Sequence, residues 1–140
     1  LQALRTVIEV YPDSEYAASA MQKFDLAFNQ LAAKEMEVGR YYLARGNFAA
    51  AANRFRVVVE DFQTTTQTPE ALYRLVEAYL SLGLDAEAQT AGAILGTNYA
   101  GTDWYRDAYA LLTGRGLRPE AAGDNWLAAI YRQVIRGEWI

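Results

Sequence analysis

The sequence predicts an all-α fold, a solenoid of stacked helical hairpins with capping helices at its C-terminal end. Three observations lead to this prediction. Apolar residues recur every three or four positions through most of the 140 residues, which is the spacing of amphipathic helices. Glycines separate such segments at Gly46 and Gly83, where a tight turn would reverse the chain. The sequences around these two glycines repeat each other with an offset of 37 residues, as neighbouring hairpins of a solenoid do.

The clearest hairpin lies within Glu35–Phe62, which reads EMEVGRYYLARGNFAAAANRFRVVVEDF. Small residues at Gly39 and Ala51 would let two antiparallel helices approach each other closely. Aromatic rings at Tyr42 and Phe55 would fill the space between them. This order of small, aromatic and turn residues matches the helix–turn–helix unit of a tetratricopeptide (TPR) repeat.

The second hairpin is a degenerate copy of the first. Gly39 corresponds to Val76, and Phe55 corresponds to Gly92, so the small and aromatic positions are not preserved. The offset also exceeds the TPR period of about 34 residues by about three. We expect the additional residues in a polar, β-branched loop over 64–68.

We divide the chain into TPR-like repeats over 1–112 and a C-terminal extension over 113–140. The expected elements, in order, are the end of one repeat over 1–11, a long helix over 14–45 paired with a helix over 47–62, a hairpin over 69–97, a capping helix over 103–112 and an amphipathic helix over 124–136. A repeat buries its apolar face only against stacked neighbours, and this chain begins inside a repeat. It is therefore expected to be the C-terminal part of a longer solenoid.

The first helix is expected to be unusually long. The stretch 14–45 contains no proline and no glycine before Gly39, so a single helix of about 32 residues and about 48 Å is predicted. Its first half would pack on a preceding repeat and its second half on the hairpin partner. A break near Asn29–Gln30 is the alternative. The predicted apolar stripe consists of Ala17, Ala20, Met21, Phe24, Ala27, Phe28, Leu31, Val38, Tyr41 and Tyr42.

Each predicted helix begins near a residue that can cap it. Side chains of Ser, Thr, Asp and Asn accept hydrogen bonds from the free N–H groups of a first helical turn. The segment 68–70, Thr-Pro-Glu, combines a cap, a proline at the first helical position and an acid in the first turn. The other candidate start residues are Asp13–Ser14, Asn47, Asp85 and Asp124.

The predicted core follows from the apolar stripes of the later helices. The helix over 47–62 would bury Phe48, Ala51, Ala52, Phe55, Val58, Val59 and Phe62. The second hairpin would bury Leu72, Leu75, Val76, Tyr79, Ala88, Ala91, Ile94 and Leu95. The capping helix would contribute Trp104, Ala108, Leu111 and Leu112.

The C-terminal helix presents two adjacent apolar stripes, formed by Trp126, Ile130 and Val134 and by Leu127, Tyr131 and Ile135. Three roles are open to such a helix: a second cap that folds back on the solenoid, a contact with a partner, or attachment to a membrane surface. Its polar face has few cations, which favours the cap.

The composition excludes several classes of function. The net charge of −4 argues against binding to bulk nucleic acid. The absence of cysteine and histidine excludes disulfides, thiol chemistry, Ser-His-Asp triads and every metal site that contains histidine. No pair of carboxylates stands out from ordinary surface charge as a general acid and base would. We therefore expect neither catalysis nor a cofactor.

Three blocks resemble a known family: 34–62 (KEMEVGRYYLARGNFAAAANRFRVVVEDF), 70–89 (EALYRLVEAYLSLGLDAEAQ) and 95–112 (LGTNYAGTDWYRDAYALL). They resemble the BamD (ComL) family of TPR lipoproteins, which belong to the outer-membrane β-barrel assembly (BAM) machine of Gram-negative bacteria. The resemblance covers about residues 1–112, and 113–140 carry no motif of the family. The family's proline after each second helix is Gln63 and Ala100 here.

The resemblance implies a non-catalytic scaffold subunit. Such proteins are anchored to the periplasmic face of the outer membrane by a lipid on an N-terminal cysteine, which this chain lacks. Their C-terminal repeats bind the membrane-proximal POTRA domain of the barrel subunit BamA, and this chain would be that half. Their N-terminal half receives the targeting signal of unfolded outer-membrane proteins, and other BAM lipoproteins are further partners.

The resemblance also implies a contact surface on the turn and the second helix of the first hairpin. The corresponding residues are Arg45, Asn47 and Arg54, of which Arg54 is the strongest candidate. It precedes core residue Phe55 and should point outward, where a guanidinium can pair bidentately with a partner carboxylate. The simpler interpretation is a solvated arginine, or an ion pair within the chain to Glu60–Asp61.

Two alternative functions remain open at this point. A generic periplasmic TPR adaptor would bind a peptide in its groove, using inward cations such as Arg40 and Arg74 and tyrosines such as Tyr41, Tyr42 and Tyr79. Core packing explains Tyr42 and Tyr79 more simply. The other alternative is the helical superhelix of a cell-wall muramidase whose catalytic domain lies elsewhere.

Overall fold

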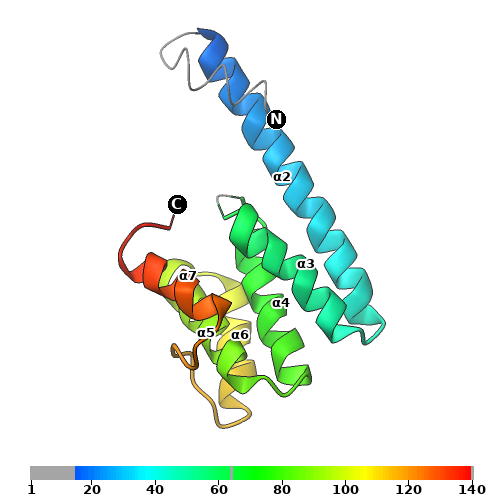
Figure 1. The fold of residues 1–140 in the computed structure, drawn as a ribbon, viewed down its shortest axis with the longest axis vertical. Coiled ribbons are helices and arrows are strands. Elements are labelled where there is room, and N and C mark those ends of the chain that lie inside the picture. Colours follow the sequence, from blue (N-terminus) through cyan, green and yellow to red (C-terminus); the bar gives the residue numbers. More distant parts are fainter. Residues whose placement is uncertain (1–14, 64, 140) are drawn as a thin grey trace.

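The fold is a stack of helical hairpins, seen in a computed structural model that describes residues 15–63 and 65–139 (Figure 1). The helices are α2 (Glu15–Ala44), α3 (Phe48–Asp61), α4 (Thr68–Ser81), α5 (Asp85–Asn98), α6 (Asp103–Thr113) and α7 (Trp126–Ile135). The described residues contain no strand, and the predicted all-α, TPR-like class is confirmed.

The helices pack in the order of a solenoid. The hairpin of α2 and α3 stacks on the hairpin of α4 and α5 through the contact between α3 and α4. Helix α6 then packs on α4 and α5, and α7 packs on α5. The first half of α2 extends well beyond the end of α3, so only its second half belongs to a hairpin (Figure 1).

Helix α2 runs without a break through all of its 30 residues. Its buried positions are Ala17, Ala20, Ala32, Met36 and Gly39. The prediction of a single apolar stripe was wrong at three positions. Met21, Leu31 and Tyr41 are 52%, 42% and 54% exposed. For Leu31 and Tyr41 the reason is that the second half of α2 packs on α3, so the neighbouring helix decides which face is buried.

The close approach of α2 and α3 is confirmed at the predicted residues. The ring of Phe55 lies so near the backbone of Gly39 that a Cβ atom there would overlap it. Both residues are fully or nearly fully buried. Glycine is therefore required at this position because any larger residue would displace the ring.

A second close approach, which the sequence pattern did not reveal, joins α5 to α6. A Cβ atom added to Gly92 would lie 2.7 Å from Cδ1 of Leu112, and one added to Gly96 would lie 2.9 Å from the ring of Tyr105. Gly92 stands where the first hairpin has Phe55. In the second hairpin, the large residue at this level therefore comes from α6, whereas in the first hairpin it comes from α3 itself.

The helix starts confirm one predicted cap and correct three. Asn47 caps α3, since its Oδ1 accepts a hydrogen bond from the backbone N–H of Ala50 at 3.3 Å. Thr68 does not cap α4 but is its first residue, and its buried hydroxyl donates to the backbone carbonyl of Phe62 at 3.0 Å. The hydroxyl of Thr68 is therefore bonded to the chain that precedes α4, and it does not cap the first turn of the helix.

The remaining start residues also differ from the prediction. Asp85 is the first residue of α5 and makes no capping hydrogen bond, because Leu84 occupies the N-cap. Helix α7 begins after Asp124, and Asn125 caps it by accepting from the N–H of Ala128 at 3.0 Å. The predicted start at 13–14 lies outside the described residues.

The C-terminal segment folds back on the solenoid. The buried residues of α7 and the tail join the common core through Leu127, Ile130, Val134 and Trp139. The indole N–H of Trp126 donates to the hydroxyl of Tyr79 at 3.0 Å. Both apolar stripes of α7 supply buried residues, Ile130 and Val134 from one and Leu127 from the other, whereas Ile135 is 59% exposed. None of the described helices has the length and apolarity needed to cross a membrane.

Candidate partner-binding surface

The outer side of the first hairpin carries two adjoining hollows. One, of about 330 Å³, is lined by Tyr42, Ala50, Asn53, Arg54 and Val57. The other, of about 360 Å³, is lined by Lys34, Glu37, Val38, Tyr41 and Tyr42. Tyr42 is the wall that they share. We call the residues of both hollows together with Arg45 the hairpin face.

Arg54 projects from α3 into the first hollow. Its side chain is 44% exposed, and its Nη1 forms an ion pair with Oε2 of Glu35 on α2 at 3.2 Å. The predicted outward orientation is therefore confirmed. The predicted in-chain partner was wrong, because Glu60 instead pairs with Arg56 at 2.8 Å on the same helix.

Arg45 reaches the same face through a pair of tyrosines. Its guanidinium carbon lies 4.5 Å from the ring centroid of Tyr41, within the range of a cation–π contact. The rings of Tyr41 and Tyr42 meet edge to face, with centroids 5.8 Å apart. Because Tyr42 also lines the hollow of Arg54, the two arginines are joined by a continuous aromatic surface.

Asn47 has a different role from the two arginines. Its side-chain oxygen is occupied by the N–H of Ala50 at the start of α3. Its backbone N–H donates to the carbonyl of Tyr42 at 3.0 Å, which closes the turn. Asn47 is exposed, but its side-chain acceptor serves the hairpin, so it acts first as the residue that fixes the turn.

Sequence reasoning missed the pairing of Arg54 with Glu35 and the contribution of Asn53 to the first hollow. Residue spacing within a helix reveals ion pairs at intervals of three or four. Glu35 and Arg54 stand on different helices, and no such interval connects them. Their contact depends on how α2 and α3 are rotated about their axes.

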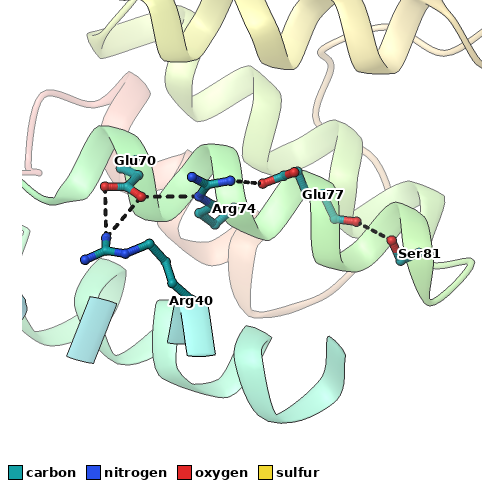
Figure 2. A network of polar contacts seen from close by, with 5 residues as sticks. All are labelled: Arg40, Glu70, Arg74, Glu77 and Ser81. Atoms are coloured by element: carbon teal, nitrogen blue, oxygen red, sulfur yellow. Dashed lines mark hydrogen bonds and ion pairs between the residues drawn. The ribbon is translucent and has the colours of Figure 1, made fainter. Parts of the chain in front are cut away.

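A second charged cluster links α2 to α4 (Figure 2). Nη1 of Arg40 donates to both carboxylate oxygens of Glu70 at 3.1 Å. On α4, Nε of Arg74 donates to Glu70 at 3.2 Å, and Nη1 of Arg74 donates to Glu77 at 2.7 Å. The two arginines predicted as peptide-groove cations are thus neutralised within the chain.

The surroundings of this cluster perturb two ionisations. Burial opposes the charged form of Arg74, but the hydrogen bonds and charges of Glu77 and Glu70 outweigh it, and the pKa of the guanidinium is raised. Burial is also the main reason that the pKa of the neighbouring Tyr73 is raised above its ordinary value. The guanidinium of Arg74 lies over the rings of Tyr73 and Trp104, at 5.4 and 5.7 Å from their centroids. This arrangement fixes side chains rather than preparing a proton for transfer.

We predict that Glu70→Gln lowers the free energy of unfolding by about 1–2 kcal/mol, because a neutral amide leaves two guanidinium groups side by side. The loss is small because the side chain of Arg40 is 41% exposed and solvent screens its charge. Urea unfolding at low and high salt measures the effect, which should shrink as salt screens the charges. The control is Glu60→Gln, which removes an exposed pair within one helix and should change stability by less than about 0.5 kcal/mol. Equal losses in the two variants would contradict a stabilising link between α2 and α4.

The described residues offer no cluster of three or more acidic side chains that could hold a metal ion. The hairpin face carries guanidinium groups and tyrosine rings. Guanidinium groups can bind carboxylates, and tyrosine rings can pack on apolar groups.

Comparison with known proteins connects this geometry to a family. The model of the family YfiO, described as outer membrane lipoprotein, matches residues 1–94. A relative from Caulobacter vibrioides is 56% identical over 119 residues, which are 85% of this chain and 39% of the relative. It is called outer membrane protein assembly factor BamD.

Other relatives of the same name are more distant. The protein from Rickettsia prowazekii is 47% identical over 106 residues, 76% of this chain and 42% of its own length. That from Neisseria meningitidis serogroup A is 36% identical over 98 residues, 70% of this chain and 37% of its own. The chain thus spans about two-fifths of the length of the curated relatives it matches.

Proposed function

Because this chain belongs to the YfiO family of outer membrane lipoproteins, we propose that it is a non-catalytic scaffold segment of an outer-membrane protein assembly factor. Within the assembly machine it binds the membrane-proximal POTRA domain of the barrel-forming subunit BamA. The hairpin face is the contact surface, and Arg54 is its central charge. The relatives are named outer membrane protein assembly factors, and this supports the assembly role.

The observation that carries the contact is the position of Arg54. It stands next to Phe55, whose burial anchors this turn of α3 in the core, so the direction of Arg54 is fixed. Its ion pair with Glu35 is exposed, and an exposed pair contributes only about 0–1 kcal/mol. A partner carboxylate that excludes water from the guanidinium would form a stronger charge-assisted hydrogen bond. Exchange of Glu35 for a partner is therefore favourable.

The remaining partners follow from the family. The full protein is held at the periplasmic face of the outer membrane by an N-terminal lipid, and it meets unfolded outer-membrane proteins and other lipoproteins of the machine. The family model's description as an outer membrane lipoprotein supports this location. Neither a nucleic acid nor a cofactor takes part.

A peptide-groove adaptor is the weaker candidate. Its groove cations would be Arg40 and Arg74, and both are already paired with Glu70 or Glu77. A peptide carboxylate would have to displace these internal partners. The muramidase superhelix has less support still, since the relatives described above are named as assembly factors.

The proposal is tested by calorimetric titration of the full-length protein, and of this chain, with the POTRA domains of a cognate BamA. Arg54→Glu should weaken binding roughly 10- to 100-fold, because a charged hydrogen bond is worth about 1.5–3 kcal/mol. Circular dichroism should show unchanged helicity. The matched control is Arg132→Glu, the same charge reversal at an exposed position of α7, which should leave the affinity unchanged.

A second variant shows whether Arg54 contacts the partner directly or only holds Glu35 in place. Glu35→Gln removes the internal partner of Arg54 and leaves the guanidinium free, so it should keep or increase the affinity. If Arg54 served only to hold Glu35, Glu35→Gln would weaken binding as much as the loss of the arginine. No binding by the unaltered full-length protein at low salt would overturn the proposed function itself.

A further inference from the structure

We propose that Tyr41, Tyr42 and Arg45 form a second anchor point on the hairpin face, which takes an apolar side chain flanked by a carboxylate. This inference rests on the proposed function and extends it, because the occupant belongs to the same partner domain that meets Arg54. The proposed anchor adds an apolar contact to the partner interface, whereas the predicted residues Arg45, Asn47 and Arg54 are all polar.

The lining and the volume of the second hollow favour binding of an apolar side chain. It lies beside that of Arg54 and shares the ring of Tyr42 with it, so a partner that covers one hollow reaches the other. Val38 and the two tyrosine rings provide apolar walls. A volume of about 360 Å³ is large enough for a partner side chain.

The charges around the hollow favour an acidic partner segment. Within the part of the chain that the structure describes, Arg54 has Glu35 as a partner, whereas Arg45 and Lys34 form no ion pair. Glu37 is the acidic residue of the second hollow. Two unpaired cations against one carboxylate leave a net positive rim, and stacking on Tyr41 already orders the guanidinium of Arg45 for bidentate binding.

Within the described residues, Tyr41 presents its ring at the surface of the first hairpin. The residue is 54% exposed, and its ring contacts are made with Tyr42 and Arg45 on the surface. Tyrosine and arginine are enriched at the centres of protein interfaces, where a rigid ring presents a large area for little loss of conformational entropy.

The test compares four variants of the full-length protein in titrations with the BamA POTRA domains at two salt concentrations. Tyr41→Ala should weaken binding about tenfold at both concentrations, because it removes apolar contact. Tyr41→Phe should stay within about twofold, since the ring remains. Arg45→Gln should weaken binding mainly at low salt, because it removes a charge contact. Tyr109→Ala is the matched control, an exposed tyrosine of α6, and should have no effect.

A cross-linking experiment identifies the occupant. The photoreactive residue p-benzoylphenylalanine, placed at position 41, should react with the POTRA domain, and mass spectrometry should find the attachment on an apolar residue within three positions of Asp or Glu. If Tyr41→Ala binds as tightly as the unaltered protein while Arg54→Glu does not, the second anchor is wrong and the proposed function stands. If attachment occurs in a basic or wholly polar segment, the assigned chemistry is wrong. If the unaltered protein fails to bind, both are wrong.

Discussion

Phe55→Ala should lower the free energy of unfolding by about 3–5 kcal/mol, the largest loss expected from a single change in this chain. The side chain is fully buried between α2 and α3. Its ring rests directly on the backbone of Gly39, which brings no side chain of its own to fill the space left behind. Neighbouring residues are held by two helices and can collapse only in part, so a cavity remains.

The same pair supports a sharper experiment with Gly39. Gly39→Ala alone should destabilise the protein by about 1–3 kcal/mol, because the new methyl group overlaps the ring of Phe55. In the Phe55→Ala background the methyl group has room, and removal of glycine from a helix contributes about 0.5–1 kcal/mol of stability. The second change should therefore be neutral or stabilising there. Urea unfolding followed by circular dichroism measures all four proteins, and additive losses would contradict the proposed contact.

Phe55 also has a bearing on function. It follows Arg54 directly, and the buried ring is what directs the arginine outward. At low temperature, where Phe55→Ala remains folded, POTRA binding should weaken only to the extent that α3 becomes mobile. The matched control for stability is Tyr109→Ala, an exposed aromatic residue whose loss should change the free energy of unfolding by less than about 0.5 kcal/mol.

Leu112→Ala is expected to have the next largest effect, about 2–5 kcal/mol. Leu112 is fully buried at the end of α6, and its Cδ1 occupies the space that a side chain at Gly92 would fill. Its truncation removes an apolar contact between α6 and α5. The loss can be measured by urea unfolding.

The control and the rescue follow from the same geometry. Leu82→Ala makes the same chemical change at a position that is 41% exposed and should cost less than about 0.5 kcal/mol. Gly92→Ala should destabilise the unaltered protein by overlap with Leu112 but restore part of the stability of Leu112→Ala. A rescue that fails, together with a small loss in Leu112→Ala itself, would show that α6 is not held at this contact.

The helices, the hairpins and the family could all be predicted from the residues alone. Apolar spacing and turn glycines predicted the all-α TPR-like fold, and Gly46 and Gly83 indeed adopt the left-handed φ of 76° and 77° that a turn after each first helix requires. The closest approach in the first hairpin, between Gly39 and Phe55, was also readable, because one residue is the smallest and the other large and apolar. The helices and turns depend on residues close in the sequence, and the approach of Gly39 to Phe55 follows from the known spacing of one repeat.

Features that depend on the rotation of a helix or on residues distant in the sequence became visible only in the packed structure. The burial of Ala32 and Met36 in place of Leu31 and Tyr41 follows from the way α2 packs against its neighbours. The same packing brings Glu35 to Arg54 and leaves Tyr41 on the surface beside Arg45. A periodic pattern defines a face of a helix but not the angle at which a neighbour meets it, and the hairpin face is a product of that angle.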